Sequence, residues 1–163
     1  MNLFQDNNWH GFAYNGIDWN SIDKPGANST QPYSISGNKI VGVYNSDFSF
    51  LYDGTTWTDI NVPEATNTLA CAIDGNNIGG FYYSSDGKMH GFFHQDGTNQ
   101  WKTIDAPGAG ERTAIFGING DDLVGFYEDP FGVKHGFVYT IPEPATAGLL
   151  VLGAVTLAIR RRK

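Results

Sequence analysis

The sequence predicts an all-β fold of repeated four-stranded antiparallel meanders, followed by a single apolar helix at the C-terminus. One observation is a segment beginning with Trp that recurs at Trp19, Trp57 and Trp101, 38 and 44 residues apart. A second is the abundance of glycine, 21 of 163 residues, often in turn-forming pairs with Asn or Asp. Between these turns lie short runs of β-branched and aromatic residues, which favour strands. The repeat unit is about 38–45 residues long.

The first and second strands of each repeat are joined by a turn of the form Ile-x-Gly-[Asn/Asp]. Asn-Gly and similar pairs between apolar runs are a strong hairpin signal. Each turn runs into a second strand that contains Gly followed by an aromatic residue. The turn segments are Ile35–Ile40, Ile73–Ile78 and Ile118–Leu123, and the second strands contain Gly42–Tyr44, Gly80–Tyr82 and Gly125–Tyr127.

The third strand carries His-Gly-Phe in three copies, whereas the second copy has Phe48-Ser49-Phe50. Equivalent positions in successive copies indicate a repeated structural role for these histidines, such as a hydrogen bond to a neighbouring turn. No Cys/His cluster or metalloprotease motif is present, so neither a metal nor a catalytic role is predicted. The predicted repeat-structural residues are His10, Phe12, Trp19, Trp57, His90, Phe92, Trp101, His135 and Phe137.

The repeats predict a domain over residues 1–140 with about three copies. The chain begins with a third and a fourth strand, continues with two complete sets, and ends with strands one to three. Such meanders are typical of propeller blades, but a propeller usually has at least four blades, so we expect an incomplete, propeller-like array. A β-trefoil also has three repeats of four strands and remains the alternative.

The charge distribution limits the choice of partner. Up to residue 144 the chain has six basic and 17 acidic residues, a formal charge of −11, which argues against nucleic-acid binding. The single cysteine, Cys71, lies between two alanines on a predicted inner strand and is expected to be buried. No nucleotide-binding loop or nucleophile motif is present, so we predict no cofactor and no enzymatic activity.

Residues 141–163 differ in composition from the repeats. Pro142, Glu143 and Pro144 are followed by 15 uncharged residues at 145–159. A helix over these residues would be about 22 Å long, short for a bilayer core but extendable by its flanks. We therefore expect a transmembrane helix at 145–159 with a cytoplasmic basic end. That end comprises Arg160, Arg161, Arg162 and Lys163.

The tail resembles the PEP-CTERM sorting signal of Gram-negative bacteria, on the strength of the Pro-Glu-Pro motif, the apolar segment and the basic cluster. This resemblance implies processing by exosortase, a localisation at the cell envelope or surface, and a link to exopolysaccharide and biofilm. The body resembles extracellular HAF-type repeats over residues 9–140, a family with no assigned chemistry. The second copy departs from that pattern at Phe48–Phe50 and Asn61–Glu64.

Two hypotheses for function follow. The first is an exported surface protein with a non-catalytic binding or scaffolding role toward exopolysaccharide, using exposed Trp and Tyr. The second is a truncated remnant of a secreted propeller-type enzyme that acts on polysaccharides. Residues 1–6 lack the basic and apolar regions of a signal peptide. Together with the incomplete array, this leads us to expect a lost N-terminal part.

Overall fold

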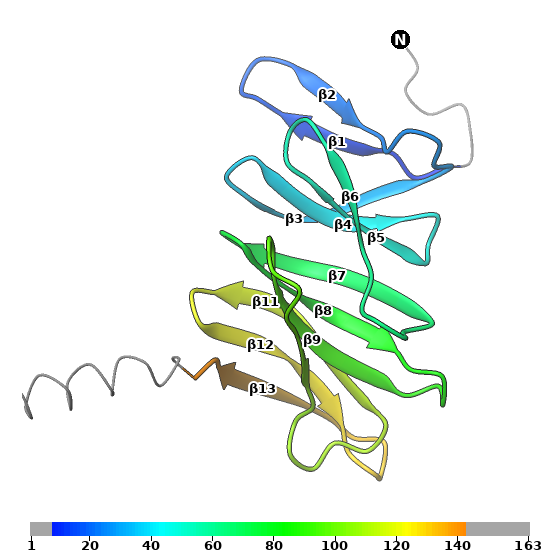
Figure 1. Cartoon of the computed structure of the whole chain (residues 1–163), viewed down its shortest axis with the longest axis vertical. Coiled ribbons are helices and arrows are strands. Elements are labelled where there is room, and N and C mark those ends of the chain that lie inside the picture. Colours follow the sequence, from blue (N-terminus) through cyan, green and yellow to red (C-terminus); the bar gives the residue numbers. More distant parts are fainter. Residues whose placement is uncertain (1–7, 143–163) are drawn as a thin grey trace, which may run out of the picture.

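The computed structural model describes residues 8–142, and every element in this part of the chain is a β-strand. The strands fall into four consecutive groups, stacked along the long axis of the molecule (Figure 1). The groups hold two, four, four and three strands. Their bounds are β1 (Gly11–Tyr14) and β2 (Trp19–Ile22); β3 (Thr30–Ser36), β4 (Lys39–Tyr44), β5 (Phe48–Tyr52) and β6 (Trp57–Ile60); β7 (Asn67–Asp74), β8 (Asn77–Tyr83), β9 (Met89–Gln95) and β10 (Trp101–Ile104); β11 (Arg112–Asn119), β12 (Asp122–Glu128) and β13 (Lys134–Thr140).

Within each group, strands that follow one another in the chain pair in an antiparallel manner. The third and fourth groups are joined by one parallel bridge, between Met89 and Arg112. This order agrees with the prediction of two strands, two complete sets and three strands. The prediction of an all-β fold with antiparallel meanders is confirmed for residues 8–142.

The turn between the first and second strands has the same backbone form in all three repeats that contain it. Gly37, Gly75 and Gly120 have φ angles of 60°, 59° and 57°. This left-handed region is strained for most residues but open to glycine. The hairpin signal in the sequence therefore reflects a real backbone requirement.

A second repeated glycine lies where the first two strands of each repeat cross most closely. A Cβ atom on Gly42, Gly80 or Gly125 would overlap the carbonyl oxygen of a residue on the neighbouring first strand. The pairing of the two strands shifts by one residue beside this glycine, as in a β-bulge. The bulged residues are Tyr33, Cys71 and Phe116.

The core lies between successive sheets. Val41, Leu51 and Ile60 of the β3–β6 sheet pack with Ile78 and Phe92 of the β7–β10 sheet. Burying one such side chain contributes roughly 1.5–3 kcal/mol. A single meander would expose this surface, so neighbouring repeats stabilise one another.

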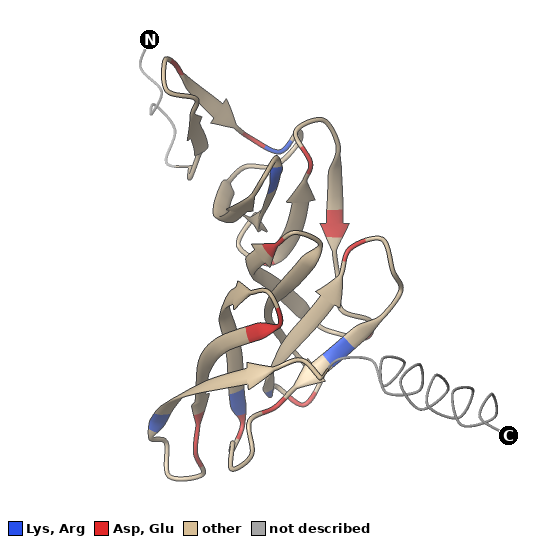
Figure 2. Cartoon of the chain, turned by 90° about the vertical axis from the view of Figure 1, so that its left-hand side faces the viewer, with Lys and Arg blue, Asp and Glu red and all other residues tan. Residues whose placement is uncertain are grey.

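The two ends of the array lie far apart. The β1–β2 pair and β13 are at opposite ends of the long axis, so the described sheets do not close into a ring (Figure 1). Acidic residues are spread along the body over turns and strand ends, in agreement with their scattered positions in the sequence (Figure 2).

Candidate functional site

The tail leaves the folded body directly after the last strand. β13 ends at Thr140, and the backbone N–H of Ile141 donates a 2.8 Å hydrogen bond to the carbonyl oxygen of Asp121. Pro142, the first residue of the Pro-Glu-Pro motif, is the last described residue and is exposed. The motif therefore begins one residue beyond a backbone contact with the β11–β12 turn.

The other predicted tail residues lie outside the described part of the chain. These are Glu143, Pro144, the predicted helix at 145–159, and Arg160, Arg161, Arg162 and Lys163. Across residues 8–142 there is no helix of the length and apolarity needed to cross a membrane.

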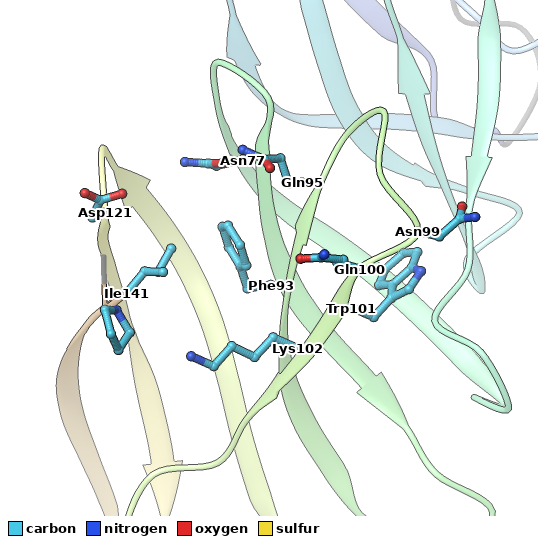
Figure 3. A pocket seen from close by; sticks show the side chains of 10 residues that line it. Asn77, Phe93, Gln95, Asn99, Gln100, Trp101, Lys102, Asp121 and Ile141 are labelled. Atoms are coloured by element: carbon cyan, nitrogen blue, oxygen red, sulfur yellow. The ribbon is translucent and has the colours of Figure 1, made fainter. Parts of the chain in front are cut away.

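A pocket of about 690 Å3 lies between the third and fourth repeats, beside the start of the tail (Figure 3). The β8–β10 part of the third repeat forms one wall, and Asp121, Ile141 and Pro142 form the other. Phe93 points into the space between these walls (Figure 3). The lining side chains combine amides, aromatic rings and one charge of each sign: Asn77, Gln95, Asn99, Gln100, Phe93, Trp101, Lys102 and Asp121.

Three of the pocket amides are available for a ligand. The side chains of Gln95, Asn99 and Gln100 are exposed and have no hydrogen-bond partner among residues 8–142. In contrast, Lys102 Nζ donates a 2.6 Å hydrogen bond to the hydroxyl of Tyr139 and lies 5.0 Å from the centre of its ring. Lys102 thus links β10 to β13 beside the pocket.

The sequence interpretation did not find this pocket. Its residues come from the turns of two different repeats, so no contiguous motif marks it. One signal was present: five residues connect β9 to β10, whereas four connect β1 to β2 and β5 to β6. The longer turn contains Asn99 and Gln100.

The repeated tryptophans stack on the third strand. Trp19 lies 4.8 Å from Tyr14, Trp57 lies 4.4 Å from Tyr52, and Trp101 lies 4.0 Å from His94, measured between ring centres. The hydroxyls of Tyr14 and Tyr52 also donate to the backbone of Gly16 and Gly54. One face of each tryptophan is therefore covered by its own repeat.

The repeated histidines pair with carboxylates. His10 Nδ1 lies 3.1 Å from Asp23, and His90 Nδ1 lies 2.9 Å from Asp105. Both aspartates follow the fourth strand, so each contact holds the third strand to the connection into the next repeat. His135 has no such strand beside it in the described residues, and its Nε2 contacts Asp129 at 3.0 Å instead.

The pKa values of the Asp129 carboxyl and the Cys71 thiol are both shifted from their ordinary values. The side-chain hydrogen bond from His135 and the backbone N–H groups of Val133 and Phe131 hold the pKa of Asp129 below its usual value. Burial raises the pKa of the Cys71 thiol to about 12. The prediction of a buried Cys71 is confirmed, and its thiol stays protonated at neutral pH.

Phe12, Phe50, Phe92 and Phe137 occupy one position in the four repeats, but their burial differs. Phe50 and Phe92 are 0% and 1% exposed, Phe137 is half-buried, and Phe12 is 63% exposed. Residues 8–142 contain no group of three or more His, Cys, Asp or Glu side chains that could hold a metal ion.

Residues 140–163 match the PEP-CTERM protein-sorting motif. Comparisons with curated proteins and with solved structures gave no significant match. The geometry thus defines an all-β repeat body, and the motif identifies the tail that continues from its last strand. The PEP-CTERM motif indicates a surface protein that is processed by exosortase, with a localisation at the cell envelope or surface.

Proposed function

We propose that this chain is a non-catalytic, polysaccharide-binding protein of the cell surface, delivered there by its PEP-CTERM tail. The observation that carries the proposal is the pocket beside the tail, whose lining includes the free amides of Gln95, Asn99 and Gln100 together with Phe93 and Trp101. Amide groups bind the hydroxyls of sugars, and aromatic rings contact their apolar faces. Exopolysaccharide of a biofilm matrix is the ligand class that fits both this lining and a surface location.

The tail has two roles in this proposal. Residues 145–159 hold the protein in the membrane as a transmembrane helix, with Arg160–Lys163 on the cytoplasmic side. Exosortase then acts at Pro142–Pro144 and releases the body to the surface. Replacing Glu143 with Ala is expected to leave the tail uncleaved when the chain is co-expressed with an exosortase. The cleaved and uncleaved forms are separated by mass spectrometry of the membrane and medium fractions.

The body in this proposal is a propeller-like array of HAF-type repeats over residues 1–140. Its support is that each of the two complete repeats forms its own four-stranded meander, whereas strands of a β-trefoil share one barrel. The first strands β3, β7 and β11 also contact one another in succession. The equivalent positions of His10, His90 and His135 in this array support a structural role for them.

Binding is tested with the full chain in detergent by affinity electrophoresis in gels that contain bacterial exopolysaccharides. The variant Asn99→Ala/Gln100→Ala removes two free amides, and we expect about a tenfold loss of affinity, since each hydrogen bond contributes about 0.5–1.5 kcal/mol. The matched control is Thr55→Ala/Thr56→Ala, at the equivalent exposed turn of the preceding repeat. Equal mobility of both variants would overturn the assignment of the site.

A hydrolysis assay on the same polysaccharides tests the non-catalytic part of the proposal. We expect no release of reducing ends by the full chain. Release that persists in the Asn99→Ala/Gln100→Ala variant would point to an enzyme with another site.

A further inference from the structure

Within residues 8–142, β13 is a third strand that has no fourth strand beside it. β5 and β9, the equivalent strands of the complete repeats, pair with β6 and β10 on their outer edges. β13 pairs with β12 alone among the described residues. Its outer edge therefore presents free backbone groups, which are a template for another strand.

The glycine of the third strand indicates what belongs on this edge. A Cβ atom on Gly11 would lie 2.5 Å from the carbonyl oxygen of Ile22, and one on Gly91 would lie 2.6 Å from that of Ile104. In the first and third repeats, the carbonyl oxygen of the fourth strand lies too close for a side chain at this position, which the small Ser49 occupies in the second repeat. At Gly136 the nearest atom would be 3.9 Å away. β13 thus keeps room for a backbone that residues 8–142 do not place there.

The side chains of β13 are also less buried than the equivalent side chains of the complete repeats. Phe137 is only half-buried, although Phe50 and Phe92 are fully covered in the complete repeats. Val138 is 70% exposed. His135 takes its carboxylate from Asp129 in the preceding loop rather than from the segment after a fourth strand.

The fourth strands of this chain share a pattern that fits these vacancies. Each begins with Trp, which stacks on the third strand, and has a buried Ile three residues later that lies opposite the small residue of the third strand. In the first and third repeats an Asp follows and contacts the histidine. A strand of this pattern would cover the ring of Tyr139, close over Gly136 and bring a carboxylate to His135.

β2 is the fourth strand that is least firmly held. β6 and β10 belong to complete sheets, whereas β2 pairs only with β1 in the described residues. Among residues 8–142, β1 has no second strand beside it, and Phe12 is 63% exposed. Pairing with β13 would place β2 on a supported sheet. The β2 and β13 of one molecule lie at opposite ends of the array, so the partner must be another molecule (Figure 1).

We propose that β13 accepts β2 of a second copy of this chain as its fourth strand. The register of β9 with β10 places Trp19 opposite Tyr139, Asn20 opposite Val138 and Ile22 opposite Gly136. This register uses the edge of β2 that pairs with β1 in the single molecule, so β2 leaves β1 on association. Asp23 exchanges its contact with His10 for His135 and the neighbouring Lys134, and the charges are complementary. The contact is head-to-tail, and it closes a pair of molecules when both ends are used or builds a chain when they are not.

Cysteine cross-linking of the full chain in detergent tests the register. Asn20→Cys combined with Val138→Cys places two exposed thiols opposite each other only across the contact between copies. We expect a disulfide-linked dimer or ladder on a non-reducing gel. The matched control is Asn20→Cys with Lys134→Cys. Lys134 lies four residues from Val138 along β13, so this pair should give no ladder. The native Cys71 is buried and stays out of the reaction.

Sedimentation of the full chain gives an independent measurement. Gly136→Val fits the free edge but blocks the close approach of a strand, so we expect at least a tenfold loss of association. Val138→Thr, two residues further along the same strand, should associate as the native chain does. Three results would overturn the proposal: a native chain that is monomeric at its highest soluble concentration, association that Gly136→Val does not weaken, or a ladder from Val138→Cys alone, which would show β13 pairing with β13.

Discussion

The two complete repeats, β3–β6 and β7–β10, form the same stacking contact between the second and third strands with different residues on the third strand. The second repeat has Phe48 stacked 5.3 Å from Tyr44, and the third has His90 stacked 5.2 Å from Tyr82. The carboxylate that contacts His90 is Asp105, and the residue equivalent to it in the second repeat is Asn61. The histidine and its carboxylate are therefore replaced together, which indicates that they act as a pair.

The second difference lies one residue further along the strand. Ser49 takes the place of Gly91, and its Oγ donates to the carbonyl oxygen of Thr68 and accepts from the N–H of Ala70, both at 2.7 Å. Thr68 and Ala70 belong to β7 of the next repeat. The departure from the common motif is thus a hydrogen-bonded link between two sheets. These two differences lie on the third strand and its contacts, while the glycine of the second strand is shared.

The largest expected effect concerns that shared glycine. Gly80→Val places a side chain against the backbone of Leu69, so we expect a loss of more than 3 kcal/mol in the free energy of unfolding or a failure to fold. Urea denaturation followed by tryptophan fluorescence measures it. Gly136→Ala, where the nearest atom is 3.9 Å away, should change the midpoint little. A tolerated Gly80→Val would contradict the requirement for glycine beside the bulge.

A smaller effect is expected at the link between sheets. Ser49→Ala leaves the carbonyl of Thr68 and the N–H of Ala70 without their partner in a fully buried place, which should cost about 2–3 kcal/mol. The same urea titration measures the loss, with the exposed Ser85→Ala as control. If both substitutions cost the same, the Ser49 hydroxyl does not stabilise the junction.

The histidine–carboxylate pair can be converted into the pair of the second repeat. A double-mutant cycle with His90→Phe and Asp105→Asn should give a coupling energy below about 1 kcal/mol, because both side chains are partly exposed. The double variant is expected to be at least as stable as the average of the two single variants. A coupling energy of zero would show that the contact contributes nothing to the free energy of unfolding.

The smallest effect extends the comparison to the last repeat, where His135 contacts Asp129. The pKa of Asp129 is lower in the folded state than the ordinary value of 3.8, mainly through the hydrogen bond from His135. Its carboxylate therefore stabilises the fold above pH 3.8, and this contribution disappears as the pH falls through the folded-state pKa. The difference in stability between the native chain and Asp129→Asn should shrink between pH 7 and pH 3. A constant difference would contradict this assignment.

The regular part of the fold could be predicted from the sequence because each repeat carries its own turn signals. The second strands expected to contain Gly42–Tyr44, Gly80–Tyr82 and Gly125–Tyr127 are β4, β8 and β12. The bulges at Tyr33, Cys71 and Phe116 were not predicted, because a one-residue shift leaves no mark on a pattern read one strand at a time.

The candidate site was harder to predict, for a related reason. Residues such as Gln95 and Asp121 meet only because two repeats pack side by side. Repetition predicts what each repeat forms by itself, whereas the pocket depends on the turns that differ between repeats. The sequence predicted a neighbouring turn as the partner of the histidines, and in the structure they contact the carboxylates of Asp23, Asp105 and Asp129.

The attachment of the tail to β13 has a mechanical consequence. If residues 143–163 attach the body to the membrane, as proposed, a pulling force on the body is transmitted first through Ile141. That load falls on the hydrogen bond to Asp121 and then on the Thr140–Asp122 pair. With β12 as its one described neighbour, β13 would peel from the sheet pair by pair, starting at the tail. Drag on the body would therefore open its last sheet before it disturbed the two complete ones.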